Sequence, residues 1–148
     1  MIARISSYFP GTESALWTKI ISPKSLQYVA LPVLSFVPTE SGAFDEEWIE
    51  GKPYDLKLYL FSVIPLGRHR IKLAKIDKEN NTIVSEETGL LARVWNHTIS
   101  FHQSGDKEIS YIDVVEIRAG LLTPIIWAFA HLFYRHRQRR WKKILKQA

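Results

Sequence analysis

Residues 91–118 read LARVWNHTISFHQSGDKEISYIDVVEIR, and this stretch decides the fold class. Two runs, 91–103 and 107–118, alternate apolar and polar residues on either side of the short segment 104–106. Alternation with period two indicates strands that bury one face, and a break of three residues containing glycine is typical of a hairpin. The stretch therefore predicts two long antiparallel strands.

The segment after this hairpin has a different period. Thr123 and Pro124 form a helix start, because a hydroxyl can cap a helix and proline at the first helical position loses no needed N–H. Apolar residues then recur at helical spacing, at Ile126, Ala130, Phe133 and Ile144. We expect a helix to about Lys146, with protein on both sides of its first three turns because these are nearly all apolar.

The upstream chain supplies the other elements of the predicted fold. A strand is expected at 2–8, helices at 13–20 and from Pro23 to before Pro32, and strands at 34–37, 43–50, 54–64, 68–77 and 82–87. Antiparallel strands with one helix laid across a face form an α+β layer. We therefore predict one helix-grip domain over residues 1–148. A curved antiparallel sheet of about seven strands wraps around the long C-terminal helix, and two short helices follow the first strand.

Composition excludes several classes of site. The chain has 148 residues, of which 46% are hydrophobic and 24% charged, as is usual for a globular domain. It has no cysteine, which excludes disulfides, zinc–thiolate sites and cysteine nucleophiles.

The first residues lack the apolar stretch of a signal peptide, so we expect a cytoplasmic protein. The apolar segment 119–134 is shorter than the roughly 20 residues that span a bilayer, and we expect a core helix there.

Basic residues are concentrated at the C-terminus. Seven of the 20 Lys and Arg residues lie after Tyr134, where there is no acid, so residues 1–134 carry 13 bases against 15 acids. The run 135–143 has three interpretations. It can be a solvated helix end that suits the negative pole of the helix dipole. It can bind an anionic membrane with Trp141 as an interfacial anchor, or it can contact nucleic acid phosphates, which we consider the least favoured partner.

The hairpin brings together two residues with chemical potential. If 104–106 is the loop, the facing pairs are His97 with Asp113, Ile99 with Tyr111, Phe101 with Ile109, and Trp95 with Val115. A carboxylate beside an imidazole fixes its tautomer, so His97 and Asp113 form a candidate acid/base pair. The alternative is a structural pair that satisfies two polar groups within an apolar sheet.

These motifs resemble a known superfamily. The strand motif Trp95-Asn96-His97 is followed by Tyr111-Ile112-Asp113-Val114-Val115, and then by a proline-started helix that contains Phe133-Tyr134-Arg135-His136-Arg137. This order resembles the START and polyketide-cyclase (SRPBCC) superfamily, and most of all its uncharacterised bacterial branch. The resemblance covers nearly the whole chain. It implies an internal cavity for lipids, polyketides or other hydrophobic molecules, in proteins of which some are cyclases or dehydratases and many only bind.

Aromatic and aliphatic residues on the expected inner faces are the candidates for contact with such a ligand. The predicted ligand-binding residues are Tyr59, Phe61, Trp95, Ile99, Phe101, Tyr111, Ile126, Phe129, Phe133 and Arg137. The same apolar stripe is also what a plain core requires. Arg137 lies four residues after Phe133 on one helix face, where it could pair with an anionic head group. Otherwise it is a surface arginine or pairs with an acid of the sheet.

Three functions follow from these patterns. The first is a non-catalytic module that binds a hydrophobic small molecule, and the second is a cyclase- or dehydratase-type enzyme using His97 and Asp113. The third is a membrane-surface adaptor acting through the basic helix. No cofactor is predicted, and no metal is assigned because His131 and His136 are five residues apart, a poor spacing for two ligands on one helix face.

Overall fold

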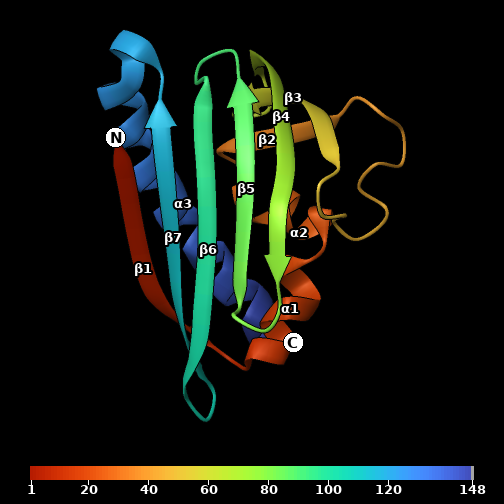
Figure 1. The fold of residues 1–148 in the computed structure, drawn as a ribbon, viewed down its shortest axis with the longest axis vertical. Coiled ribbons are helices and arrows are strands. Elements are labelled where there is room, and N and C mark those ends of the chain that lie inside the picture. The colour runs from red at the N-terminus through yellow and green to blue at the C-terminus, as the bar shows by residue number, and fades with distance from the viewer. Residues whose placement is uncertain (148) are drawn as a thin grey trace.

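The computed structural model describes residues 1–147 (Figure 1). Its elements are β1 (Ile2–Pro10), α1 (Glu13–Ile20), α2 (Pro23–Ala30), β2 (Leu34–Pro38), β3 (Pro53–Leu60), β4 (Ile64–Asp77), β5 (Thr82–Gly89), β6 (Val94–Gly105), β7 (Glu108–Arg118) and α3 (Thr123–Lys146). A single 3-10 turn, Gly120–Leu122, joins β7 to α3. The predicted α+β helix-grip class is confirmed.

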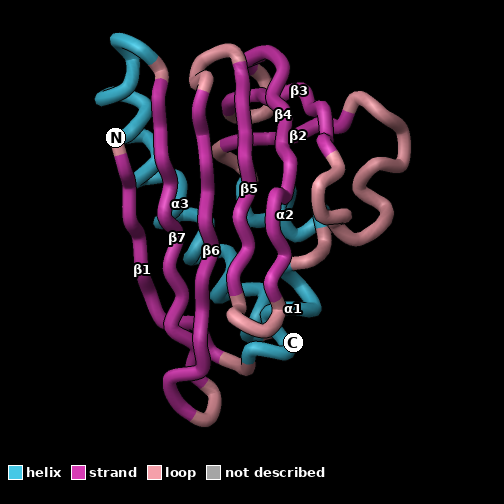
Figure 2. The backbone as a smooth tube through the Cα atoms, in the orientation of Figure 1, coloured by secondary structure: helices cyan, strands magenta, loops and turns pink. Residues whose placement is uncertain are grey.

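The seven strands form one antiparallel sheet in the order β1-β7-β6-β5-β4-β3-β2. In Figure 1, α3 (blue) runs diagonally behind the sheet, and α1 and α2 lie on that same side below β2. Figure 2 traces the same two layers along the backbone, with the sheet curving around the helix. The helix packs against β1, β7 and α2, which leaves room between its middle and strands β3 to β6.

The two short helices begin where the sequence predicts. The Thr12 Oγ1 atom accepts a hydrogen bond of 3.2 Å from the Ala15 N–H, and Pro23 occupies the first turn of α2. The expected cap at Thr123 is wrong. Its hydroxyl accepts from the Ala119 N–H and donates to the Gly120 carbonyl, so it closes the preceding 3-10 turn instead.

The strand predicted at 43–50 is wrong, because this segment is a loop. Phe44 and Trp48 are buried and pack edge-on, but Glu46, which an inward-facing strand would bury between them, is exposed. Gly42 and Gly51 have positive φ values of 76° and 81°, and they turn the chain at the two ends. Phe44 and Trp48, four residues apart and both buried, therefore gave this loop the alternating pattern of a strand.

The long strand predicted at 54–64 is two strands joined by a tight turn. Phe61 and Ser62 have φ values of 52° and 62°, and the segment expected to end the strand, 65–67, lies inside β4. Tight hairpin turns with positive φ usually use glycine or asparagine, so nothing in this sequence marks the turn. The even-numbered residues of β3 face inward, with Tyr54 and Leu56 buried, and Tyr59 lies on the other face.

The first turns of α3 are less covered than expected. Ile125 is 68% exposed and Leu132 is 70% exposed, so the prediction of protein on both sides is wrong. The buried stripe of α3 is narrower and consists of Ala130, Phe133, Tyr134, Arg137, Gln138, Trp141 and Leu145. Among residues 1–147, no helix combines the length and the apolar character needed to cross a bilayer.

The predicted β6–β7 register is wrong by two residues. His97 faces Val115, Ile99 faces Asp113, Phe101 faces Tyr111 and Trp95 faces Ile117. The ladder shifts between Gln103 and Gly105, and Gly105 pairs with Glu108. A bulge of this kind inserts one extra residue into one strand, here Ser104, and the connection shortens to residues 106–107. Because side chains alternate with period two, a shift of two residues leaves every side chain on its predicted face.

Candidate functional site

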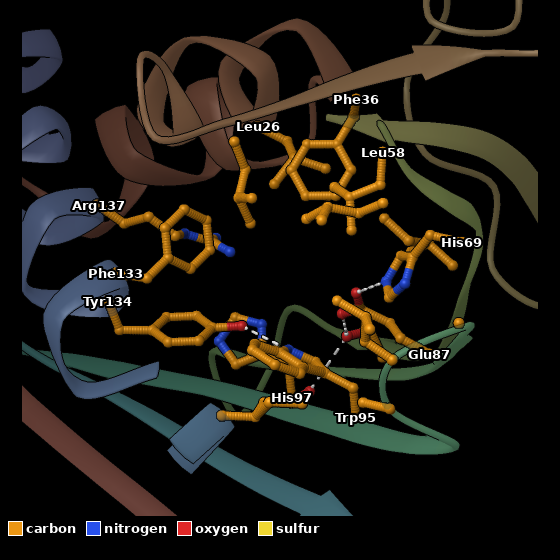
Figure 3. A pocket seen from close by; sticks show the side chains of 18 of the residues that line it. Leu26, Phe36, Leu58, His69, Glu87, Trp95, His97, Phe133, Tyr134 and Arg137 are labelled. Carbon is orange, nitrogen blue, oxygen red and sulfur yellow. Dashed lines mark hydrogen bonds and ion pairs between the residues drawn. The ribbon is translucent and has the colours of Figure 1, made fainter. Parts of the chain in front are cut away.

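A cavity of about 320 Å³ lies between the inner face of the sheet and α3. Its walls come from α1, α2, β2 to β6, the β5–β6 loop and α3, and they are mostly aliphatic and aromatic. Figure 3 looks into this cavity, with Phe133, Tyr134 and Arg137 on one side and His69 and Glu87 on the other.

The cavity brings together most of the predicted ligand-binding residues. Those that line it are Trp95, Ile99, Ile126, Phe129, Phe133 and Arg137, and His97 lines it as well. Four predicted residues do not line it. Tyr59 lies on the opposite face of β3, and Phe61 is 58% exposed in the β3–β4 turn. Phe101 and Tyr111 are buried further along the sheet, where their rings stack on each other.

His97 is held from behind by a buried network. Its Nε2 atom lies 2.6 Å from Asp113 Oδ1, and the side chain of Asp113 is fully buried. Asp113 also accepts hydrogen bonds from the Tyr111 hydroxyl at 3.2 Å and from Gln138 Nε2 at 2.9 Å. Gln138 is fixed in turn, because it accepts from the Ser7 hydroxyl and donates to the Ile5 carbonyl. Asp113 therefore supports His97 without lining the cavity.

This network determines which nitrogen of His97 faces the ligand space. A carboxylate that accepts three hydrogen bonds requires the imidazole proton on Nε2. Within residues 1–147, Nδ1 of His97 makes no hydrogen bond, and the ring borders the cavity. His97 thus has a free acceptor nitrogen in the cavity wall.

A second polar cluster, which the sequence interpretation missed, lies across the cavity. Glu87 Oε1 is 2.9 Å from Nε2 of His69, and Glu87 Oε2 accepts from the Ser85 hydroxyl at 2.7 Å. Burial alone would raise the pKa of Glu87, but the contact with His69 and the Ser85 hydrogen bond help to outweigh it, and the pKa is lowered. Glu87 is therefore a buried carboxylate anion beside an apolar space.

Gly89 makes the position of His69 possible. His69 and Gly89 face each other on β4 and β5, and a Cβ atom at residue 89 would lie 2.7 Å from Nδ1 of His69. Any larger residue would therefore displace the ring. The neighbouring Glu86 lies on the opposite face of β5, where it is exposed and its Oε2 is 3.6 Å from Lys72 Nζ.

Tyr134 is the third polar group of the wall. Its hydroxyl oxygen accepts a hydrogen bond of 2.9 Å from Trp95 Nε1, which leaves its own proton without an acceptor among the described residues. Burial is the main cause of a raised pKa at Tyr134, and Arg137 opposes it. The hydroxyl stays protonated and can donate.

Arg137 is neither at the surface nor paired with an acid of the sheet. It is 6% exposed, lines the cavity, and has no carboxylate within 4.0 Å among residues 1–147. Its guanidinium lies 4.9 Å from the centre of the Tyr134 ring and 5.8 Å from that of Phe133. Burial acts to lower the pKa of Arg137, but the neighbouring Tyr134 and the carboxylates of Asp113 and Glu87 outweigh it and raise that pKa. The side chain is therefore a buried cation.

Some residues in the basic C-terminal part of α3 make contacts inside the protein. Trp141 is 1% exposed and lines the cavity, so its interpretation as an interfacial membrane anchor is wrong. The Arg140 guanidinium lies 3.9 Å from the centre of the Tyr28 ring, and its Nη2 donates to the Tyr28 carbonyl at 3.0 Å. Arg139 and Lys143 remain exposed.

Comparison with solved structures identifies the fold. The chain superposes on a Thermus thermophilus protein with a TM-score of 0.72 at 11% identity, covering 99% of this chain and 98% of that one. A START superfamily protein from Mycobacterium smegmatis gives 0.70 at 10% identity, with 99% and 97% covered. Truncated norcoclaurine synthase from Thalictrum flavum gives 0.69 at 12% identity, with 97% and 92% covered. The START-like fold implied by the sequence resemblance is confirmed.

Sequence comparison gives a single family. Residues 7–145 match the model described as "Domain of unknown function (DUF8410)". Comparison with the curated proteins finds no match to this sequence.

Proposed function

The chain belongs to the DUF8410 family, and we propose that it binds a hydrophobic small molecule, lipid- or polyketide-like, in the cavity between its sheet and α3. The cavity itself carries this proposal. At about 320 Å³, it has roughly twice the volume of the 150 Å³ cavity that accepts benzene, and it lies within the range of ligand sites. Its lining is mostly aliphatic and aromatic, so an apolar ligand gains both burial and dispersion contacts there.

An apolar entrance supports the same proposal. Leu90, Leu91 and Ile125 line the cavity, yet they are 78%, 44% and 68% exposed. Residues that border both the cavity and solvent form its mouth. Arg68 also lines the cavity and is exposed, so the mouth combines these aliphatic side chains with a basic residue, and an apolar molecule can enter past the aliphatic part.

The test uses a matched pair of substitutions on adjacent residues of β3. Leu58 lines the cavity, whereas Tyr59 lies on the opposite face. N-phenyl-1-naphthylamine, a neutral dye that becomes fluorescent in apolar surroundings, is the probe. We expect saturable binding to the wild-type protein, weaker binding to Leu58→Trp, because the indole takes up part of the cavity, and unchanged binding to Tyr59→Trp. Equal affinity in wild type and Leu58→Trp would refute the cavity as the site.

An enzymatic role is the second candidate, favoured by one observation. His97 borders the cavity with Nδ1 free while Asp113 holds Nε2 at 2.6 Å. This is the arrangement of a general base with a positioning carboxylate. In a dehydration, Nδ1 would take a proton from the carbon next to a thioester carbonyl. The β-hydroxyl would then leave as water with that proton, forming a double bond. The fold also occurs in a protein named as a synthase.

The N-acetylcysteamine thioester of 3-hydroxydecanoic acid tests this second role. Formation of the conjugated enoyl thioester is followed by its absorbance. A catalytic His97 predicts turnover by the wild-type protein that falls by at least about 100-fold in His97→Gln, as is usual for loss of a general base. Dye binding should be retained in the same variant. Absence of turnover in the wild-type protein would reject this dehydration and leave the binding role intact.

A further inference from the structure

Three hydrogen-bond donors belong to side chains of α3 that line the cavity, and none of them has an acceptor in the described chain. Nε of Arg137 and Nε1 of Trp141 are buried and have no hydrogen-bond partner in the described chain. The Tyr134 hydroxyl is already an acceptor for Trp95, so its proton is also free. Residues 134, 137 and 141 are spaced by three and four, which puts them on one face of the helix, and all three line the cavity.

Such donors are costly to leave unpaired. A buried polar group without a partner loses its hydration and receives nothing in return, and a buried charge loses more. The rings of Tyr134 and Phe133 stabilise the cation of Arg137 through their faces, but they accept none of its N–H groups in the plane of the guanidinium. An acceptor on a bound molecule would therefore stabilise these donors.

The carboxylates of the protein do not supply this acceptor. Asp113 is satisfied by His97, Tyr111 and Gln138, and Glu87 is satisfied by His69 and Ser85. Both are too far from Arg137 for an ion pair, since no such pair within 4.0 Å occurs between described residues. Neither acid therefore neutralises Arg137, and Figure 3 shows Glu87 and Arg137 on opposite sides of the cavity.

We propose that the ligand is an amphiphilic monoanion whose carboxylate binds Arg137, with Tyr134 and Trp141 as further donors, and whose apolar body fills the rest of the cavity. This inference rests on the proposed binding function and names the class of its ligand. The planar guanidinium matches a carboxylate with two parallel hydrogen bonds. A single negative charge neutralises the buried cation of Arg137, whereas a dianion would add an unpaired charge to a cavity whose wall already holds the Glu87 carboxylate.

The experiment compares two probes that differ only in their head group. Decanoate and decan-1-ol displace N-phenyl-1-naphthylamine from the wild-type protein, from Arg137→Met, and from Arg139→Met as an exposed control on the same helix. In the wild-type protein we expect decanoate to bind at least about 10-fold more tightly than decan-1-ol, the effect of a hydrogen bond to a charged group. The preference should disappear in Arg137→Met and persist in Arg139→Met. Arg137→Lys keeps the positive charge but loses the planar guanidinium with its two parallel donors. Its preference for decanoate should lie between those of the wild-type protein and Arg137→Met.

A second readout does not depend on the stability of the variants. In ¹H–¹⁵N spectra of the wild-type protein, decanoate should shift the Arg137 Nε–H and Trp141 Nε1–H signals, and decan-1-ol should shift them much less. A wild-type protein without preference for decanoate, or a preference that Arg137→Met leaves intact, would overturn the inference while dye binding still supports the cavity. Failure of the dye to bind would overturn the proposed function and this inference together.

Discussion

His97 and Asp113 are joined across two strands by a 2.6 Å hydrogen bond, although they do not face each other in the ladder. His97 is opposite Val115, and Asp113 is opposite Ile99, so the contact is diagonal. Diagonal neighbours on one face lie about 7–8 Å apart at the backbone, which long or ring-shaped side chains can span. The imidazole reaches across this gap and places its free nitrogen at the cavity wall.

The first prediction concerns the acid of this pair. In Asp113→Asn, the amide group can no longer accept from both Gln138 and Tyr111, so at least one buried donor loses its acceptor. We expect the free energy of unfolding in urea to fall by about 1–3 kcal/mol.

The control for this change is Asp106→Asn in the exposed turn between β6 and β7. The same chemical change there should alter the free energy of unfolding by less than about 0.5 kcal/mol. Equal effects at the two positions would mean that the Asp113 network contributes nothing beyond its charge.

A comparison of two phenylalanines tests whether the cavity is empty in the free protein. Phe101 and Phe133 are each 3% exposed, but only Phe133 lines the cavity. Phe101→Ala should destabilise by about 3–5 kcal/mol. Phe133→Ala should cost at least about 1 kcal/mol less, because one side of that ring already lacks packing partners. Urea melts measure both, and a larger cost for Phe133 would indicate that its surroundings are fully packed.

The pH dependence of stability reports on Glu87. The pKa of Glu87 is lowered in the folded protein, so the ionised group adds stability above its ordinary pKa of 4.5. That contribution is lost as the pH falls through the lower folded value. We therefore expect the difference in unfolding free energy between wild type and Glu87→Gln to shrink as the pH falls below 4.5. Glu86→Gln, on the opposite face, is the control and should lack this acid-dependent difference.

The sequence predicts the order of elements because the determinants are local. The starts of α1 and α2 depend on Thr12 and Pro23, whose effects act within one turn. The sheet face of each side chain in β6 and β7 follows from the alternation. It is predicted correctly although the register is shifted by two residues. The predicted register of β6 and β7 is wrong because the bulge at Ser104 has no sequence signal. The turn at Phe61 was not predicted because it lacks the glycine that such turns usually contain.

The candidate site was predicted only in part. His97 and Arg137 were identified from the motif strands and the helix, whereas His69, Ser85 and Glu87 were missed. A signal for the missed residues existed, because His69 alternates with Ile71 and Leu73, and Ser85 and Glu87 alternate with Ile83. The absence of a carboxylate beside Arg137 among the described residues depends on packing between distant elements, which no local pattern encodes.

Two neighbouring arginines separate structural from surface roles in α3. Arg140→Ser removes the stacking on Tyr28 and the hydrogen bonds to its carbonyl, and should cost about 1–2 kcal/mol in urea melts. Arg139→Ser, at an exposed position, should change stability by less than about 0.5 kcal/mol. If both variants were equally stable, the contact between Arg140 and Tyr28 would contribute nothing in solution.

Arg139 and the other exposed cations of α3 allow a test of the membrane-surface adaptor role. Binding to acidic vesicles through exposed cations gains about 1 kcal/mol per residue and weakens with salt. Trp141 is inside the protein, so we expect the protein to cosediment with acidic vesicles weakly at most, and only at low salt. Changing Arg139, Lys142 and Lys143 to Ser should reduce this cosedimentation. Strong binding that persists at high salt would favour the adaptor role.

Binding of an apolar molecule between the sheet and α3 can be measured directly. Isotope-filtered NMR with labelled protein and unlabelled decan-1-ol identifies the side chains that touch the bound molecule. We expect NOEs from the decyl chain to the methyl groups of Leu58, Ile99 and Ile126, which line the cavity. Absence of such NOEs at saturating decan-1-ol, or NOEs confined to exposed residues such as Leu121 and Leu132, would contradict binding in the cavity.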